Sequence, residues 1–243
     1  MTSSITTNYL RVLRFLRSYH RWSGEGLHHL LTDQACLIVG YHGRGLPPDL
    51  GVLTLEIYER KGYLPHFILH KRMWEVPVIN KIVDDCGAVP GDGERIREAV
   101  ARGESLVVAP GGTQEMARSF RTRYEVDFGR RRGYLKFALQ LGIPIVPVGS
   151  AGCDEVFIGL NDGHRLSRRL GLPKDIPLWF GVGLTGLYPL SLPMPVKLHT
   201  IVGEPIDPHQ AVDLPADHPD FLERLNAVVT GRLQGLLDQA RAR

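Results

Sequence analysis

A chain of 243 residues is long enough for one sizeable α/β core, although two domains are not excluded. Its formal net charge of +3 is too small to indicate a nucleic-acid-binding protein, and 43% hydrophobic with 23% charged residues excludes a disordered chain. The three cysteines, Cys36, Cys86 and Cys153, show no metal-ligand or CxxC spacing. This usage is typical of reduced thiols in a cytosolic protein.

The N-terminal segment predicts an amphipathic helix. Arginines line one side and apolar residues recur at spacings of three and four on the other: Arg11, Arg14, Arg17 and Arg21 against Ile5, Tyr9, Val12, Leu13, Leu16 and Tyr19, with Trp22 at the end. Such a helix is suited either to the interface of an anionic membrane or to packing on the domain. Because no uninterrupted apolar run occurs in this segment, no secretory signal is predicted. We expect a cytoplasmic protein with peripheral membrane association.

The remaining chain alternates between short apolar runs and longer amphipathic segments. Strands are predicted over residues 37–41, 65–69, 88–90, 106–109, 145–149 and 196–202, and helices over 49–61, 71–86, 92–102, 131–141 and 219–241. This order is typical of an α/β fold with a single mixed, mostly parallel sheet flanked by helices. We divide the chain into an N-terminal helical segment, 1–31, and an α/β domain, 32–243.

The first predicted strand ends in Gly40-Tyr41-His42-Gly43-Arg44, and Asp49 follows at the start of a helix. A histidine placed in a loop by glycines, with a carboxylate nearby, has the parts of a general base and its orienting acid. The alternative is an ordinary loop histidine and a helix N-cap aspartate.

A second apolar run, 105–109, ends in Pro110-Gly111-Gly112-Thr113-Gln114-Glu115. A turn without obstructing side chains lets backbone N–H groups approach a ligand closely, although most Gly-Gly pairs only reverse the chain.

Further along, Arg130, Arg131 and Arg132 precede a predicted helix, where cations are disfavoured by the helix dipole. Three arginines at this position predict an anionic ligand, such as the phosphates of coenzyme A, of an acyl carrier or of a lipid. The alternative is a solvated basic turn.

Residues 176–196 carry no charge over twenty-one positions. Proline and glycine interrupt this stretch too often for a membrane-spanning helix. Two interpretations remain open: Trp179, Phe180, Leu184, Leu187 and Tyr188 line a lipid-facing mouth, or the stretch is a buried connection to the last strand.

These segments, with Pro144-Ile145-Val146-Pro147-Val148, resemble the glycerolipid acyltransferase superfamily over residues 35–207. In that family a His-x4-Asp motif, a Phe-Pro-Glu-Gly-Thr-Arg motif and a proline-bounded strand follow one another in this order. His42 matches the catalytic histidine, and Gly112-Thr113 matches the Gly-Thr pair. The resemblance implies the fold of this family and acyl-CoA or acyl carrier protein as the acyl donor, with no cofactor.

The departures from the family pattern concern the acid and the phosphate site. Six residues, not four, separate His42 from Asp49. The family's glutamate and arginine positions are taken by Gly111 and Gln114, as in the neutral-lipid branch of diacylglycerol and monoacylglycerol acyltransferases, which carries Gly-Gly-x-x-Glu here.

The sequence thus predicts acyl transfer to a hydroxyl of a glycerolipid or long-chain alcohol at a membrane surface, with His42 as general base and Asp49 as its partner. Substrate contacts are expected from residues of the second motif and the arginine tract: Gly111, Gly112, Thr113, Gln114, Glu115, Arg118, Arg130, Arg131 and Arg132. Backbone N–H groups of 111–113 are the candidate oxyanion donors. Alternatives are a lysophospholipid acyltransferase, with Arg118, Arg121 and Arg123 restoring the phosphate contact, a non-catalytic lipid-binding protein and a thioesterase. No metal is predicted, because the ten histidines form no HExxH-like pattern.

Overall fold

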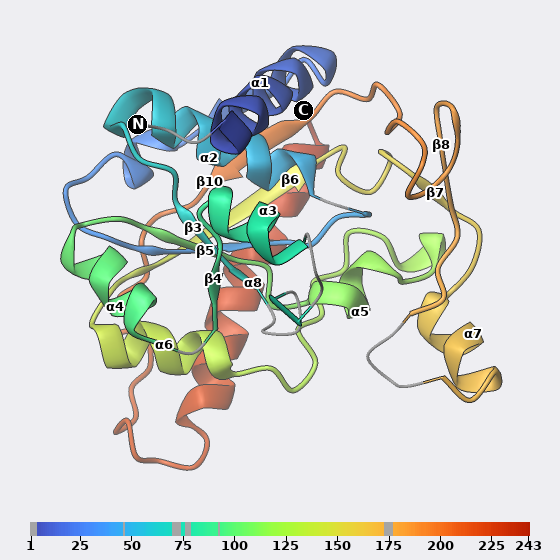
Figure 1. Ribbon diagram of the computed structural model, residues 1–243. Helices are drawn as coiled ribbons and strands as arrows, with labels where there is room; N and C mark the ends of the chain where they lie inside the picture. The colour runs from blue at the N-terminus through green and yellow to red at the C-terminus, as the bar shows by residue number, and fades with distance from the viewer. Residues whose placement is uncertain (1–3, 46, 70–73, 76–78, 92, 173–176) are drawn as a thin grey trace.

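A seven-stranded sheet lies at the centre of the protein (Figure 1). The computed structural model describes residues 4–45, 47–69, 74–75, 79–91, 93–172 and 177–243. The strand order is β1-β10-β6-β2-β5-β3-β4, and only the β10–β6 pair is antiparallel among these described strands. Their bounds are β1 Ser23–Glu25, β2 Leu37–Gly40, β3 His66–Leu69, β4 Val89–Pro90, β5 Leu106–Val108, β6 Ile145–Ala151 and β10 His199–Val202. The predicted mixed, mostly parallel sheet is confirmed.

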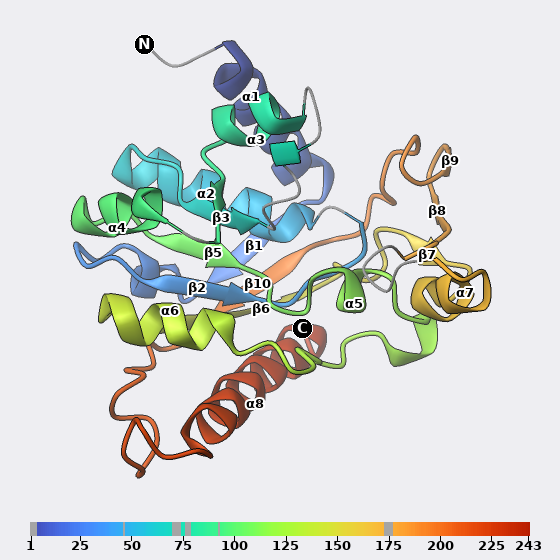
Figure 2. The same cartoon turned by 60° about the horizontal axis from the view of Figure 1, so that its bottom comes forward.

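Helices cover both faces of this sheet (Figure 2). Their bounds are α1 Ser4–Tyr19, α2 Pro48–Lys61, α3 Ile79–Asp85, α4 Glu94–Ala101, α5 Gly112–Met116, α6 Gly133–Leu141, α7 Gly163–Arg169 and α8 Phe221–Arg241, with 3₁₀ turns η1 Leu27–Leu30 and η3 Phe120–Thr122. Residues 71–73 and 76–78 of the helix predicted over 71–86 lie outside the described residues. Sequence reasoning missed α5 and α7.

The alternation of side chains along β2 separates two cores. Leu37 and Val39 join the cluster formed with α4, α6 and α8, whereas Ile38 joins the cluster with α2 on the other face. Helix α8 crosses β6 so closely that a Cβ on Gly149 would lie 2.6 Å from the backbone nitrogen of Leu237. Both faces of the central strands are therefore buried, as their continuous apolar runs indicate.

The predicted N-terminal helix forms and packs on α2. Leu10 and Leu13 are buried together with Leu55 of α2. The basic side is also engaged, because Arg14 pairs with Glu59 at 3.0 Å and Arg17 pairs with Glu56 at 2.7 Å. Of the two roles expected for the apolar side of this helix, the structure thus shows packing on the domain. Strand β1, which belongs to the predicted segment 1–31, pairs with β10 at the edge of the sheet.

The uncharged stretch contributes to a second, three-stranded sheet that the sequence did not predict. Strands β7 (Ile158–Gly159), β8 (Gly181–Gly183) and β9 (Gly186–Leu187) form it in that order, all antiparallel. No described helix is both long and apolar enough to cross a membrane. Trp179 is buried, in keeping with a buried connection, whereas Leu187 is exposed. A lipid-facing role for the exposed part stays a prediction.

Candidate active site

The site forms where three neighbouring strands end. Because β2 lies between β5 and β6, the loops that follow these parallel strands emerge side by side. His42 follows β2, the Gly111–Glu115 motif follows β5, and Asp154 follows β6. The carboxyl ends of parallel strands are the usual place for ligand sites in such sheets.

His42 is held in one orientation by its own loop. Its Nδ1 lies 2.8 Å from the carbonyl oxygen of Gly43. Because a carbonyl only accepts, Nδ1 carries the proton and Nε2 keeps its lone pair. Burial lowers the pKa of His42, with Arg118 acting in the same direction and Asp154 opposing it. The imidazole is therefore neutral at neutral pH, with Nε2 able to accept a proton.

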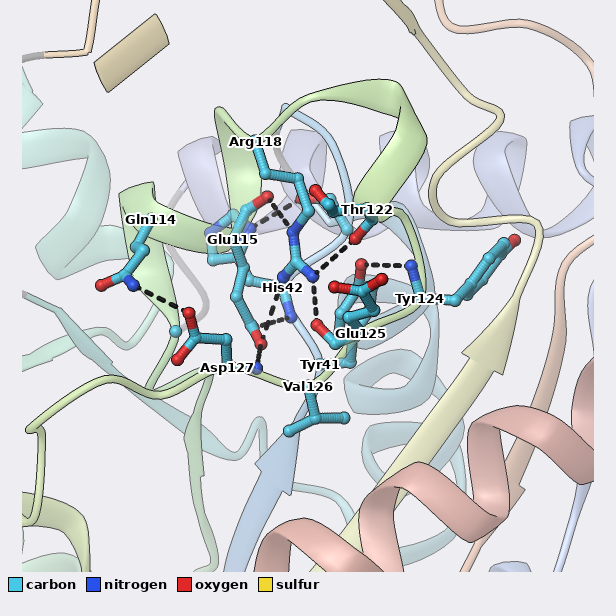
Figure 3. Close-up of polar contacts among 12 residues, drawn as sticks. Tyr41, His42, Gln114, Glu115, Arg118, Thr122, Tyr124, Glu125, Val126 and Asp127 are labelled. Carbon is cyan, nitrogen blue, oxygen red and sulfur yellow. Dashed lines mark hydrogen bonds and ion pairs between the residues drawn. The ribbon is translucent and has the colours of Figure 1, made fainter. Parts of the chain in front are cut away.

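Glu115 fixes the backbone of this loop (Figure 3). Its Oε2 accepts the N–H of His42 at 2.9 Å, and its Oε1 accepts the N–H of Asp127 at 2.9 Å. Arg118 Nη2 lies 3.2 Å from Oε1. Glu115 is fully buried, and burial raises its pKa to about 7 against the lowering effect of Arg118 and the two N–H groups.

The carboxyl group of Glu115 occupies the volume that a side chain at Gly111 would fill. A Cβ on Gly111 would lie 1.9 Å from Cδ of Glu115, which is a steric overlap with the carboxyl group. The backbone of Gly111 itself is ordinary, with φ −63° and ψ −30°. The family pattern that the sequence resembles has glutamate at the position of Gly111. Here the carboxylate of Glu115 fills the space that a side chain there would need.

A second buried acid, Asp154, contacts Tyr41, which directly precedes His42, and Arg44, which lies two residues after it. Its Oδ2 accepts the hydroxyl of Tyr41 at 2.6 Å and the backbone N–H of Tyr124 at 2.7 Å. The guanidinium of Arg44 lies 3.7 Å from Oδ1 and also donates to the carbonyl of Arg118 at 3.0 Å. Asp154 and Arg44 have no exposed side-chain surface. His42 is thus placed between two acid-anchored segments.

Asp49 is buried at the start of α2 but is not bonded to His42. Within the described residues no hydrogen bond or ion pair joins the two, and Nδ1 of His42 is engaged by Gly43. Burial raises the pKa of Asp49 to about 6, opposed by the hydroxyl of Ser150. The direct pairing expected from the sequence is therefore not seen among the described residues. Asp49 lies in the first turn of α2, with six residues between it and His42.

The predicted oxyanion donors are only partly available. The N–H of Gly112 already donates to the carbonyl of Ala109 at 3.0 Å. The N–H groups of Gly111 and Thr113 make no hydrogen bond to any described residue, so these two remain as possible donors.

The arginine tract precedes α6 as predicted, but two of its members have protein partners. Arg131 donates to the carbonyl of Gly111 at 2.7 Å and thereby supports the turn. Arg132 pairs with Glu223 at 2.8 Å. Arg130 is exposed. An anionic ligand is therefore not needed to explain Arg131 and Arg132.

A cavity of about 460 Å³ borders the motif and contains basic and acidic groups in balance. It is lined by Thr113, Gln114, Arg118, Thr122, Glu125, Asp127, Arg131, Asp162, His164 and Arg168. Gln114 donates to Asp127 at 3.0 Å, and Arg118 donates to the carbonyls of Glu115 and Thr122 at 2.9 and 3.1 Å. Gln114 and Arg118, which the sequence put forward for substrate contacts, thus have protein partners. In the part of the chain that the structure describes, no group of three or more potential metal ligands occurs.

Sequence reasoning missed Tyr41, Arg44 and Asp154. Tyr41 directly precedes His42 and Arg44 lies two residues after it, and this proximity in the sequence was the available signal. Asp154 closely follows the predicted strand 145–149, but its partner Tyr41 lies 113 residues away in the chain, so no signal in the sequence indicated their contact.

The comparisons with known proteins found related sequences over most of the chain. A family model described as diacylglycerol acyltransferase matches residues 3–243. A human protein named "DGAT1/2-independent enzyme synthesizing storage lipids" is 28% identical over 221 residues, which is 91% of this chain and 62% of the relative. An uncharacterized protein of Mycobacterium tuberculosis is 29% identical over 227 residues, which is 92% of this chain and 62% of the relative. The chain spans about six tenths of the length of these relatives.

Among solved structures, the 1-acyl-sn-glycerophosphate acyltransferase PlsC from Thermotoga maritima matches with a TM-score of 0.54 and 18% identity. The match covers 98% of this chain and 83% of that one. It shows that the fold is that of a glycerolipid acyltransferase, as the resemblance implied. Because the family model covers nearly the whole sequence, the chain belongs to the diacylglycerol acyltransferase family.

Proposed function

We propose that the protein transfers an acyl group from a thioester, acyl-CoA or acyl carrier protein, to the hydroxyl of a neutral lipid at a membrane surface. The observation that carries this proposal is the state of His42: a neutral imidazole at the carboxyl end of β2, with Nδ1–H on Gly43 and Nε2 unbonded among the described residues. A hydroxyl is a poor nucleophile at neutral pH, and a positioned base contributes about 100- to 10,000-fold.

The proposed step conserves atoms and charge. Nε2 of His42 takes the proton of the acceptor hydroxyl as its oxygen attacks the thioester carbonyl. The oxyanion is stabilised by the N–H groups of Gly111 and Thr113. Collapse breaks the C–S bond, and the imidazolium returns the proton to the departing thiolate, which leaves a new ester, a free thiol and neutral His42. No acyl-enzyme forms, so donor and acceptor are bound together.

We retain Asp49 as an acid that stabilises the imidazolium. Its carboxylate is buried and Oδ1 has no hydrogen-bond partner in the described structure. Its charge acts on Cys153, and Gly43 packs so closely on Cys153 that a Cβ there would lie 2.7 Å from the carbonyl oxygen of Cys153. The charge of Asp49 and the packing of the His42 loop thus both act on Cys153, while Asp154 is the acid whose charge raises the pKa of His42.

A neutral acceptor is supported by the groups around the motif. A dianionic phosphate needs free arginine donors, and each charge-assisted hydrogen bond is worth about 1.5–3 kcal/mol. Arg118 is committed to Glu115 and to backbone carbonyls, and Gln114 is bound to Asp127. Of the arginines that line this cavity, Arg168 has no side-chain hydrogen bond or ion pair with a described residue, and the carboxylates of Asp127 and Asp162 in the same lining disfavour a dianionic headgroup.

Acceptor-dependent thiol release tests the proposal. The protein is incubated with acyl-CoA and, in parallel, with diacylglycerol, monoacylglycerol, a long-chain alcohol, lysophosphatidate or no acceptor. We expect release only with acceptor, and a larger specificity constant for a neutral lipid. Equal release without acceptor would identify a thioesterase, no release with any acceptor would favour a lipid-binding role, and a preference for lysophosphatidate would overturn the acceptor class.

A further inference from the structure

Exposed apolar side chains are concentrated on one side of the protein. Among the described residues, nine of the eleven exposed large hydrophobic side chains lie between 158 and 192. They are Ile158, Leu160, Leu170, Leu172, Phe180, Leu184, Leu187, Leu190 and Leu192. Leu190 is 96% exposed. Contiguous exposure of this kind in a folded protein marks an interaction surface.

The three-stranded sheet explains why these side chains point outward. Ile158, Val182 and Leu187 are direct cross-strand partners and so share one face of the sheet. Gly159, Gly181 and Gly183 occupy the opposite face, where a Cβ would overlap Arg44, Trp179 or Phe157. The glycine face packs inward on aromatic rings. The opposite face, with Ile158, Val182 and Leu187, is termed the apolar face, and no described element covers it.

Helix α7 adds positive charge beside the apolar face (Figures 1 and 2). Arg165, Arg168 and Arg169 are exposed, and none of them forms an ion pair with a described residue. Hydrogen bonds from Leu160 to Phe180 and from Leu178 to Gly163, 2.9 and 3.1 Å, tie the helix to the sheet. A hollow of about 570 Å³ between them brings Leu160 and Leu166 together with Arg121, Arg165 and Arg169.

An apolar face bordered by unpaired arginines fits an anionic lipid membrane. Apolar side chains enter the headgroup boundary, and arginines near the surface are attracted to anionic lipids. A second copy of this chain fits less well, because a symmetric contact would bring arginine against arginine. The nearby carboxylate of Asp162 does not offset this repulsion, because it caps the N-terminus of α7. Helix α1 is also less suited, because Arg14 and Arg17 are neutralised by glutamates of α2.

We propose that the apolar face and α7 form the surface by which this protein docks on anionic membranes. The docking surface lies close to the loop that carries His42. A Cβ on Gly45, three residues after His42, would touch the rings of Tyr188 and Phe157, which underlie the small sheet. Docking therefore brings the lipid surface to the His42 loop. This last step rests on the proposed function, whereas docking itself does not.

Vesicle sedimentation tests the docking surface without catalysis. Phosphatidylcholine vesicles with and without phosphatidylserine are mixed with the wild type, with Leu187→Glu/Leu190→Glu, with Arg165→Glu/Arg169→Glu and with Phe15→Glu. Phe15 on α1 is 54% exposed and serves as the matched control. We expect about tenfold weaker binding to anionic vesicles for both double variants, unchanged binding for Phe15→Glu, and weaker binding of the wild type to neutral vesicles.

Several outcomes would overturn the docking proposal. Wild-type binding by Leu187→Glu/Leu190→Glu, or an equal loss in Phe15→Glu, would place docking elsewhere. A wild-type dimer that the Leu187→Glu/Leu190→Glu variant converts to a monomer would show that a second copy covers the face. His42→Ala is expected to bind vesicles like the wild type, because docking does not need the base. A wild-type protein that docks but transfers no acyl group would disprove the proposed function and leave the docking surface intact.

Discussion

The backbone N–H of His42 donates to Oε2 of Glu115 at 2.9 Å. The other carboxylate oxygen accepts the N–H of Asp127, so Glu115 ties the β2 loop to the segment that follows α5. Glu115 touches no atom that the proposed reaction changes. It is a positioning residue that sets where the imidazole lies relative to the Gly111–Thr113 turn.

Replacing Glu115 by Gln is expected to lower kcat about tenfold or more with a smaller effect on KM. An amide has one acceptor oxygen, so either His42 or Asp127 loses a charge-assisted bond of about 1.5–3 kcal/mol. Steady-state kinetics with a saturating donor measure the two constants. A kcat equal to that of the wild type would remove the positioning role.

The same variant changes how stability depends on pH. The pKa of Glu115 is raised to about 7 in the folded protein, from about 4.5, so its ionisation destabilises the fold as pH rises through that interval. The effect is on the order of 3 kcal/mol. Melting temperatures between pH 5 and 8.5 should fall more for the wild type than for Glu115→Gln. Parallel curves would show that Glu115 ionises normally.

Gly111→Ala is expected to destabilise the protein by about 1–3 kcal/mol and to reduce turnover, because its Cβ overlaps the Glu115 carboxyl. Gly133→Ala is the matched control, since a Cβ there meets nothing within 4 Å. In Gly111→Ala/Glu115→Ala the overlap is gone, so the two losses should be less than additive. Additive losses would show that the two positions are independent.

Asp49→Asn should separate stability from activity. The pKa of Asp49 is raised to about 6 by burial, so above that pH its charge destabilises the fold. The amide is expected to raise stability at pH 8 by on the order of 1–3 kcal/mol while turnover falls, because it cannot stabilise an imidazolium. Unchanged turnover would assign that role to Asp154, the acid whose charge raises the pKa of His42.

The main sheet was predictable because its strands are short apolar runs between glycine-rich turns. Gly62 and Gly142, both with positive φ, end α2 and α6 close to where the sequence predicts. The small sheet was not predictable, because the glycines of Gly181–Gly183 weaken any strand pattern. Their presence follows from close packing on Trp179 and Phe157, which only the tertiary structure shows.

The candidate site was predictable in part for a similar reason. His42 and Glu115 lie in local motifs, so both were found. The contact between them, the overlap at Gly111 and the bonds of Asp154 to Tyr41 depend on how separate loops meet. The arginines were misleading because charge in a sequence does not show which carbonyl or carboxylate will engage it, as for Arg118 and Arg131.

Acceptor-dependent thiol release by His42→Ala, measured across pH beside the wild type, tests the central claim most directly. Wild-type kcat/KM is expected to rise with pH through an apparent pKa below 6.5, because only neutral imidazole accepts the proton and burial lowers its pKa. The variant should lose about 100-fold or more at an unchanged melting temperature, together with this pH dependence. Turnover within a few-fold of the wild type, with the same pH profile and the same melting temperature, would contradict the assignment of His42 as the base.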